Sequence, residues 1–112
     1  PSQPIIFATP AFFELTEYSQ EEVLGYNCRF LQGPDTDPAA IDRLRTAIKQ
    51  RRAVEEGLLN YTKSGKPFWN LLCLTPLCAR GSQEVTHYLG VQRDITSSVE
   101  KCSERNTAQL RR

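Results

Sequence analysis

The chain has 112 residues, of which 39% are hydrophobic, a length that supports one domain with a single core. Its 14 basic and 13 acidic residues leave a net charge of +1, and they form no basic stripe interleaved with aromatics, which argues against nucleic acid as a direct partner. No apolar run approaches the roughly 18 residues that a membrane span requires, and no signal peptide opens the chain, so we expect a soluble module.

The first half of the chain begins with a short β-branched and aromatic run, Pro4–Ala8, which predicts a strand. A helical stretch is expected over residues 11–18. Ser19 followed by Glu22 forms a capping box, which predicts a second short helix that stops at Gly25.

The segment GYNCRFLQG, residues 25–33, should contain a further turn of helix. Asp37 and Pro38 then supply a helix cap and a first-turn proline, which predict a long helix ending near Gln50. An apolar stripe marks the buried side of this helix: Ile41, Leu44 and Ile48.

The second half of the chain changes to strand patterns. The predicted strands cover residues 54–62, 67–79 and 85–95, and the glycine in the turn at 63–66 favours a hairpin between the first two. A polar tail, residues 97–112, follows and has some helical character. This order predicts an α+β domain in which helices cover one face of an antiparallel sheet.

Alternation along the predicted strands places several amides among apolar side chains. The face that should lie under the helices carries Leu58, Asn60, Phe68, Asn70, Leu72, Leu74, Tyr88, Gly90 and Gln92. A buried amide without a partner costs about 1 to 3 kcal/mol, so these groups need hydrogen bonds. An amide offers a donor and an acceptor together, which suits the edge of a uracil-like or flavin-like ring.

Two arginines extend this sketch of a ligand. Arg45 borders the apolar stripe of the long helix, and Arg29 lies in the GYNCRFLQG segment. Two guanidiniums at one cleft would form a receptor for a phosphate, and the alternative is a pair of ordinary surface arginines.

The four cysteines form no CxxC pair, and His87 is the only histidine, so we expect no metal site. Free thiols are typical of a reducing compartment, which indicates the cytoplasm or nucleus.

The segment GYNCRFLQG resembles the core motif of LOV domains, the flavin-binding, blue-light-sensing branch of the PAS family. Further blocks resemble the same family in the same order: PIIFATPAF, ELTEYSQEEVLG, LLNYTKSGKPFWNL and YLGVQRDIT. The resemblance covers nearly all of residues 4–96. It implies a PAS fold with a photosensory core over residues 1–96, followed by the tail 97–112 as a linker to an effector.

The resemblance also assigns roles. Cys28 matches the cysteine that forms a reversible adduct with flavin C4a under blue light, and Gln92 matches the glutamine beside flavin N5 that relays the signal. Arg29 and Arg45 match the phosphate-binding arginines, which makes FMN the expected cofactor. The remaining matches are amides that contact the flavin (Asn27, Gln32, Asn60 and Asn70) and side chains that pack against its ring (Leu31, Leu72, Leu74 and Tyr88).

The chain departs from the family pattern in a few places. Tyr26 stands where arginine is common, and Leu72 stands where many members have phenylalanine. Family members also have a first strand before the Pro4 region, in the middle of the sheet, whereas only residues 1–3 precede Pro4 here. We therefore expect an open slot beside the strand at 85–95.

The outward face of the sheet is the expected surface for partners. Trp69, Leu71 and Cys73 alternate with the inward set, which favours a homodimer or an effector domain docking there. The alternative to a photoreceptor is a light-insensitive PAS domain that binds partners through this face. A conventional enzyme is disfavoured because no pair of nucleophile and base is visible.

Overall fold

The computed structural model describes residues 5–101 and shows an α+β domain. Strands β1 (Val54–Tyr61), β2 (Pro67–Cys78) and β3 (Val85–Asp94) form an antiparallel sheet in the order β1-β2-β3. The three strands confirm the predicted hairpins. Within the described residues, β3 is an edge strand of the sheet.

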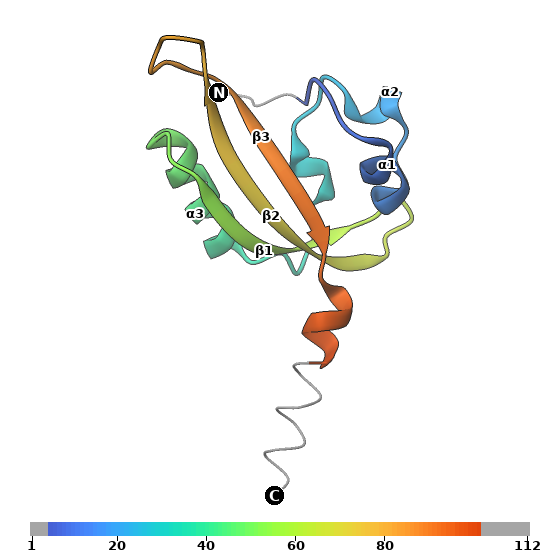
Figure 1. The fold of residues 1–112 in the computed structure, drawn as a ribbon. Coiled ribbons are helices and arrows are strands. Elements are labelled where there is room, and N and C mark those ends of the chain that lie inside the picture. The colour runs from blue at the N-terminus through green and yellow to red at the C-terminus, as the bar shows by residue number, and fades with distance from the viewer. Residues whose placement is uncertain (1–4, 102–112) are drawn as a thin grey trace, which may run out of the picture.

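Four helical elements precede the sheet, namely α1 (Pro10–Thr16), α2 (Gln20–Val23), the 3-10 helix η1 (Cys28–Leu31) and α3 (Pro38–Lys49). The predicted caps are present, since Ser19 and Glu22 form the capping box of α2 and the Asp37 side chain accepts from the backbone of α3. In the view of Figure 1, α3 lies to the left of β2 and β3, and the block of α1, α2 and η1 lies to the right of them.

The predicted strand at Pro4–Ala8 is wrong for the residues described, because 5–9 have no regular secondary structure and Pro4 lies outside the described range. Ile5 instead donates its backbone N–H to the carbonyl of Tyr26 (2.8 Å) and accepts from the N–H of Gly25 (2.7 Å). Its partner is the loop after α2, and a single pair of bonds makes no ladder.

The core of the sheet lies beneath α3. Ala40 and Leu44 of α3 pack against Leu58 of β1 and Leu72 of β2, and all four are at least 92% buried. Apolar surface removed from water contributes about 25 cal/mol per Å², so this cluster is the main attachment of α3 to the sheet.

The block of α1 and α2 is attached to the β1–β2 turn by polar contacts. The backbone N–H of Lys63 donates to the carbonyl of Thr16 (3.0 Å), and that of Ser64 donates to the carboxylate of Glu17 (3.1 Å). The Lys63 ammonium also pairs with Glu22 at 2.8 Å. These contacts restrict where η1 lies, because only residues 24–27 separate it from α2.

Gly33, the last residue of the GYNCRFLQG segment, lies against the ring of Tyr61, and a Cβ at this position would overlap the ring. The backbone N–H of Gly33 donates to the Thr36 hydroxyl, which in turn donates to the carbonyl of Leu59. Glycine is therefore needed for close packing of the loop on β1.

The chain leaves the sheet through a set of hydrogen bonds at the end of β3, which we call the Thr96 anchor. The Thr96 hydroxyl accepts from the backbone N–H of Trp69 (2.8 Å) and donates to the carboxylate of Asp94 (2.6 Å). The neighbouring N–H of Ile95 donates to the carbonyl of Trp69 (2.9 Å). Residues 96–101 are helical and lead away from the sheet in Figure 1, whereas tail residues 102–112 lie outside the described range.

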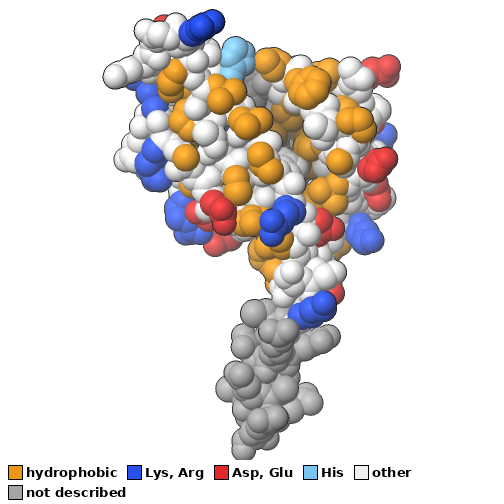
Figure 2. Space-filling model, in the orientation of Figure 1, with side chains coloured by type: hydrophobic (Ala, Val, Ile, Leu, Met, Phe, Trp, Pro, Cys, Tyr) orange, Lys and Arg blue, Asp and Glu red, His pale blue; other side chains and the backbone are white. Residues whose placement is uncertain are grey.

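The outward face of the sheet carries the predicted apolar side chains. Trp69, Leu71 and Cys73 are half-buried and alternate with the buried inward residues Phe68, Asn70 and Leu72. Figure 2 views this side of the molecule and shows hydrophobic side chains gathered over β2 and β3. Leu89 and Val91, which extend the face onto β3, are 51% and 55% exposed. No helix among residues 5–101 is long and apolar enough to cross a membrane.

Candidate functional site

The inner face of the sheet, which is the side covered in part by α3, brings together most of the predicted ring-binding residues. The register pairs Leu72 of β2 with Gln92 of β3, and Leu74 with Gly90. Asn70 lies two residues before Leu72 on the same face of β2, opposite Leu58 of β1. Amide groups thus lie at one end of this face and apolar side chains in the middle.

The amide end has two buried acceptors without partners. Asn60 and Asn70 are 3% and 1% exposed, and the Asn70 Nδ2 donates to the Asn60 Oδ1 at 2.9 Å. The Asn70 Oδ1 and the Gln92 Oε1 are buried and accept no hydrogen bond within residues 5–101. An unpaired buried carbonyl costs about 1 to 3 kcal/mol, so these oxygens require a donor from a ligand or water.

The middle of the inner face is shaped for a flat group. Gly90 lies between Tyr88 and Gln92 on this face, and a Cβ at Gly90 would stand 3.3 Å from the Leu74 Cδ2. Absence of a side chain at this point leaves the backbone open to close approach by a planar ligand. Leu72 is buried and Leu74 half-buried, which supplies an apolar floor.

Cys28 is the first residue of η1, and local contacts fix its position. The Asn27 side chain caps η1 by accepting from the N–H of Arg29 (3.0 Å), and Leu31 anchors the element with 1% exposure. Cys28 retains contact with solvent, yet the protein around the sulfur desolvates it and raises the pKa of the thiol above its usual 9.0. The thiol is therefore protonated at neutral pH.

The remaining predicted site residues lie at the surface. Gln32, which ends η1, and both Arg29 and Arg45 are exposed. Within the part of the chain that the structure describes, neither guanidinium has an ionic partner. Their role as a joint phosphate receptor stays a prediction, as does the role of Gln32.

A flavin fits the residues of the inner face. Its pyrimidine ring presents an N–H to acceptors such as the Asn70 Oδ1, and its flat ring system matches the apolar floor and the open backbone at Gly90. No group of three or more metal-ligating side chains occurs in the described residues.

A family model described as PAS domain matches residues 1–97. The light-state structure of the blue-light photoreceptor Aureochrome1 LOV is 41% identical, with a TM-score of 0.84 over 95% of this chain and 84% of that chain. The chain belongs to the LOV branch of the PAS family. A second LOV domain, from a blue-light activated histidine kinase of Erythrobacter litoralis, is 42% identical, with a TM-score of 0.78 over 83% of this chain and 84% of that one.

Curated relatives of this LOV domain are much longer proteins. Phototropin-2 of Oryza sativa subsp. japonica is 50% identical over 105 residues, which are 94% of this chain and 12% of phototropin-2. A blue-light-activated histidine kinase of Brucella anthropi is 44% identical over 104 residues, 93% of this chain and 21% of the kinase. The LOV domain thus corresponds to a small part of each relative.

Two tertiary hydrogen bonds between a side chain and the backbone were missed from sequence. The Tyr88 hydroxyl donates to the backbone carbonyl of Ile48 at 2.9 Å, and the Thr96 hydroxyl forms the anchor to Trp69. Tyr88 was expected only to pack against the ring. Neither bond has a local sequence signal, because each partner is a backbone group in a distant part of the chain.

Proposed function

We propose that this LOV domain is a blue-light receptor that binds FMN and signals through a reversible bond between Cys28 and the flavin. The observation that carries the proposal is the buried, unpaired Asn70 Oδ1, which suits the one ring N–H of a flavin and lies beside an apolar floor that a flat ring can cover. A protein of marginal stability rarely keeps such a group without a ligand to satisfy it.

FMN bound on this face would supply the light-absorbing ring and a reversible acceptor for a thiol, and Cys28 would provide both the sulfur and the proton. The protein contributes a protonated thiol, since the raised pKa of Cys28 keeps the proton available. The cap at Asn27 and the buried Leu31 hold the thiol in place. Positioning of this kind removes the entropic cost of bringing the two groups together.

Gln92 provides the route for the signal. Its amide can present nitrogen or oxygen, so it could rotate to follow a change in the hydrogen-bonding character of a bound ring. Gln92 lies two residues before Asp94, which accepts from Thr96 in the anchor. A shift of β3 would therefore reach the start of the helix at residues 96–101.

The phosphate of FMN distinguishes it from riboflavin, and we assign its recognition to Arg29 and Arg45. Both are exposed and free of ionic partners within residues 5–101, which leaves their charge available. Charge-assisted bonds to phosphate are about twice as strong as neutral ones, so FMN should bind more tightly than riboflavin.

The output of the domain is assigned to the outward face and the tail. The half-buried Trp69, Leu71 and Cys73 form an apolar surface suited to a second copy of the chain or to an effector domain. We place catalysis, if the whole protein has any, outside this domain. The free thiols of Cys28, Cys73 and Cys78 favour a reducing compartment, cytoplasm or nucleus.

The proposal is tested by reconstituting the protein with FMN. We expect a yellow protein with triple-peaked blue absorption that bleaches in blue light and recovers in the dark. Cys28→Ala should retain the flavin and lose the bleaching. A protein that takes up no flavin would instead support the light-insensitive PAS alternative, and a Cys28→Ala variant that bleaches normally would exclude Cys28 as the bonding residue.

A further inference from the structure

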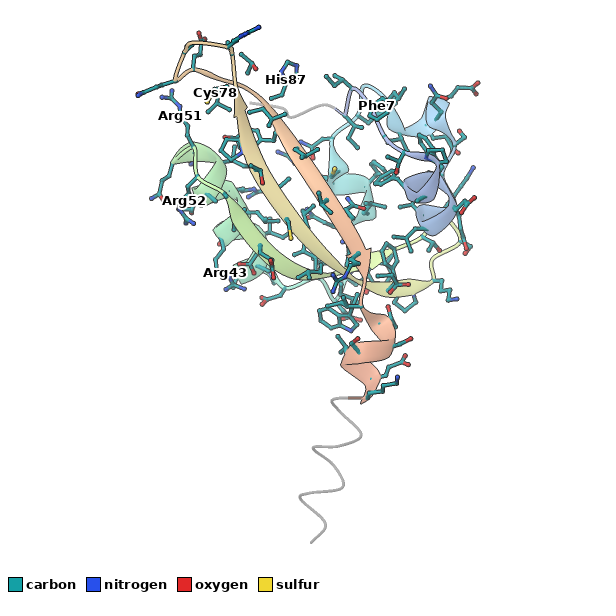
Figure 3. All side chains as sticks on the ribbon, viewed as in Figure 1. Phe7, Arg43, Arg51, Arg52, Cys78 and His87 are labelled. Atoms are coloured by element: carbon teal, nitrogen blue, oxygen red, sulfur yellow. The ribbon has the colours of Figure 1, made fainter. Side chains whose placement is uncertain are left out.

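Tyr88 connects strand β3 to the last turn of α3. Its Cα belongs to β3, opposite Pro76 of β2, while its hydroxyl donates to the carbonyl of Ile48 in the last turn of α3 at 2.9 Å. Figure 3 shows Arg51, which follows α3, at the same end of the molecule as Cys78 and His87 of the β2–β3 hairpin. The side chain therefore crosses from sheet to helix at that end.

The position of Tyr88 along the strand places it at the far end of the proposed ring site. Gln92, Gly90 and Tyr88 share one face of β3, and four residues of antiparallel strand span about 14 Å at about 3.4 Å per residue. A three-ring system whose polar edge meets the Asn70 Oδ1 and whose central ring lies by Gln92 would cover Gly90 and point its benzenoid end toward Tyr88.

The hydrogen bond makes this side chain a fixed wall. One end of the phenol is held by the β2–β3 ladder and the other by a carbonyl at the end of α3, a region where carbonyls lack partners within the helix. Tyr88 is half-buried, so the bond is partly shielded from water. Without the hydroxyl, the ring would be free to change rotamer and the end of the site would open.

We infer that Tyr88 is a specificity-determining residue that limits the length of the ring system and excludes flavins enlarged at the benzenoid end. The inference rests on the proposed flavin site and adds to it the residue that defines one boundary. It concerns the hydroxyl of Tyr88, since phenylalanine would fill nearly the same volume but could not bond to Ile48.

The test compares binding of riboflavin with binding of its 8-dimethylamino analogue, which is bulkier at the benzenoid end and shares the same polar edge. The unaltered protein should prefer riboflavin clearly. Tyr88→Phe should reduce that preference roughly three- to tenfold, the effect of losing one hydrogen bond. Tyr88→Leu, which removes the wall, should abolish the preference.

Tyr61→Phe is the matched control, because it also removes a single tyrosine hydroxyl that takes part in a tertiary hydrogen bond, here from the N–H of Asp35 at 3.3 Å. It should leave the riboflavin preference unchanged. Hydrogen exchange of the ligand-free proteins gives an independent readout: the N–H of Arg51, which donates to the carbonyl of Ile48, should exchange faster in Tyr88→Phe and not in Tyr61→Phe.

The possible failures are distinguishable. If no flavin binds the unaltered protein, the proposed function is wrong and the inference falls with it. If both flavins bind and Tyr88→Phe leaves their ratio unchanged, the proposed function survives and the inference is wrong. Equal binding of the two flavins by the unaltered protein would also overturn it.

Discussion

Replacing Asn70 with leucine should separate ligand binding from stability. In the ligand-free protein, Asn70 contributes one hydrogen bond to Asn60 and carries one unpaired acceptor. Leucine has a similar volume and removes both. The unpaired Asn70 Oδ1 disappears, which returns about 1 to 3 kcal/mol, but the Asn60 Oδ1 loses its partner at a similar cost.

These two effects nearly cancel, so we expect the unfolding free energy of ligand-free Asn70→Leu to lie within about 1 kcal/mol of the unaltered protein. Asn60→Leu should be more destabilising, because it leaves both polar groups of Asn70 unpaired at this buried position. The double variant removes every member of the pair and should be the most stable of the three. Urea unfolding of the flavin-free proteins measures this order.

Flavin binding should respond differently. Asn70→Leu deletes the acceptor that a ring N–H would use, which should weaken riboflavin binding by about 1 to 3 kcal/mol, or roughly 5- to 150-fold. Fluorescence titration measures the change. Riboflavin affinity equal to that of the unaltered protein would refute the role of the unpaired acceptor. Destabilisation of ligand-free Asn70→Leu by more than about 3 kcal/mol would show that the gain from removing the Asn70 Oδ1 does not offset the loss at Asn60.

Further predictions concern the signal, the thiol, the phosphate and the acid limit of stability. Gln92→Leu should still bleach in blue light but lose the light-induced change in hydrogen exchange at β3, and an unchanged response would count against amide rotation. Because desolvation raises the pKa of Cys28, bleaching should be constant through neutral pH and decline only above pH 9.0; folding stability should fall in the same range, since the folded state holds that proton more tightly. Neutralising Arg29 or Arg45 with glutamine should weaken FMN by about 1.5 to 3 kcal/mol and riboflavin much less, and equal losses would show structural roles. Hydrogen bonding in its ion pair lowers the pKa of Glu22 to about 2, so Glu22→Gln should be destabilising above pH 4.5, and the difference from the unaltered protein in acid titrations should vanish as pH falls toward 2.

The elements with local signals were predictable from sequence. The cap at Asp37, the capping box at Ser19 and the alternation of β2 each depend on residues a few positions apart, and all three occur in the structure. The grouping of Asn60, Asn70 and Gln92 on one face followed from the two-residue period of strands, once the hairpins were placed.

Other features depend on tertiary contacts that a sequence does not encode locally. A strand was predicted at Pro4–Ala8, but whether a segment joins a ladder depends on its neighbour, and the neighbour of Ile5 is the loop at Gly25. The bond from Asn70 to Asn60 was also not foreseen, since both amides were expected to face the ligand. The bond from Tyr88 joins residues 40 positions apart, and no periodicity marks it.

The Thr96 anchor has a consequence for whatever follows the domain. The backbone of Trp69 holds the first residue of the helix at 96–101 to β2, so the rotational phase of the helix is set by the sheet. An α-helix turns about 100° per residue, and an insertion of one residue after Thr96 would therefore swing a helically joined module to a different side of the domain. Linker lengths that differ by three or four residues would nearly restore the original azimuth, so light responses of fused proteins should vary periodically with linker length.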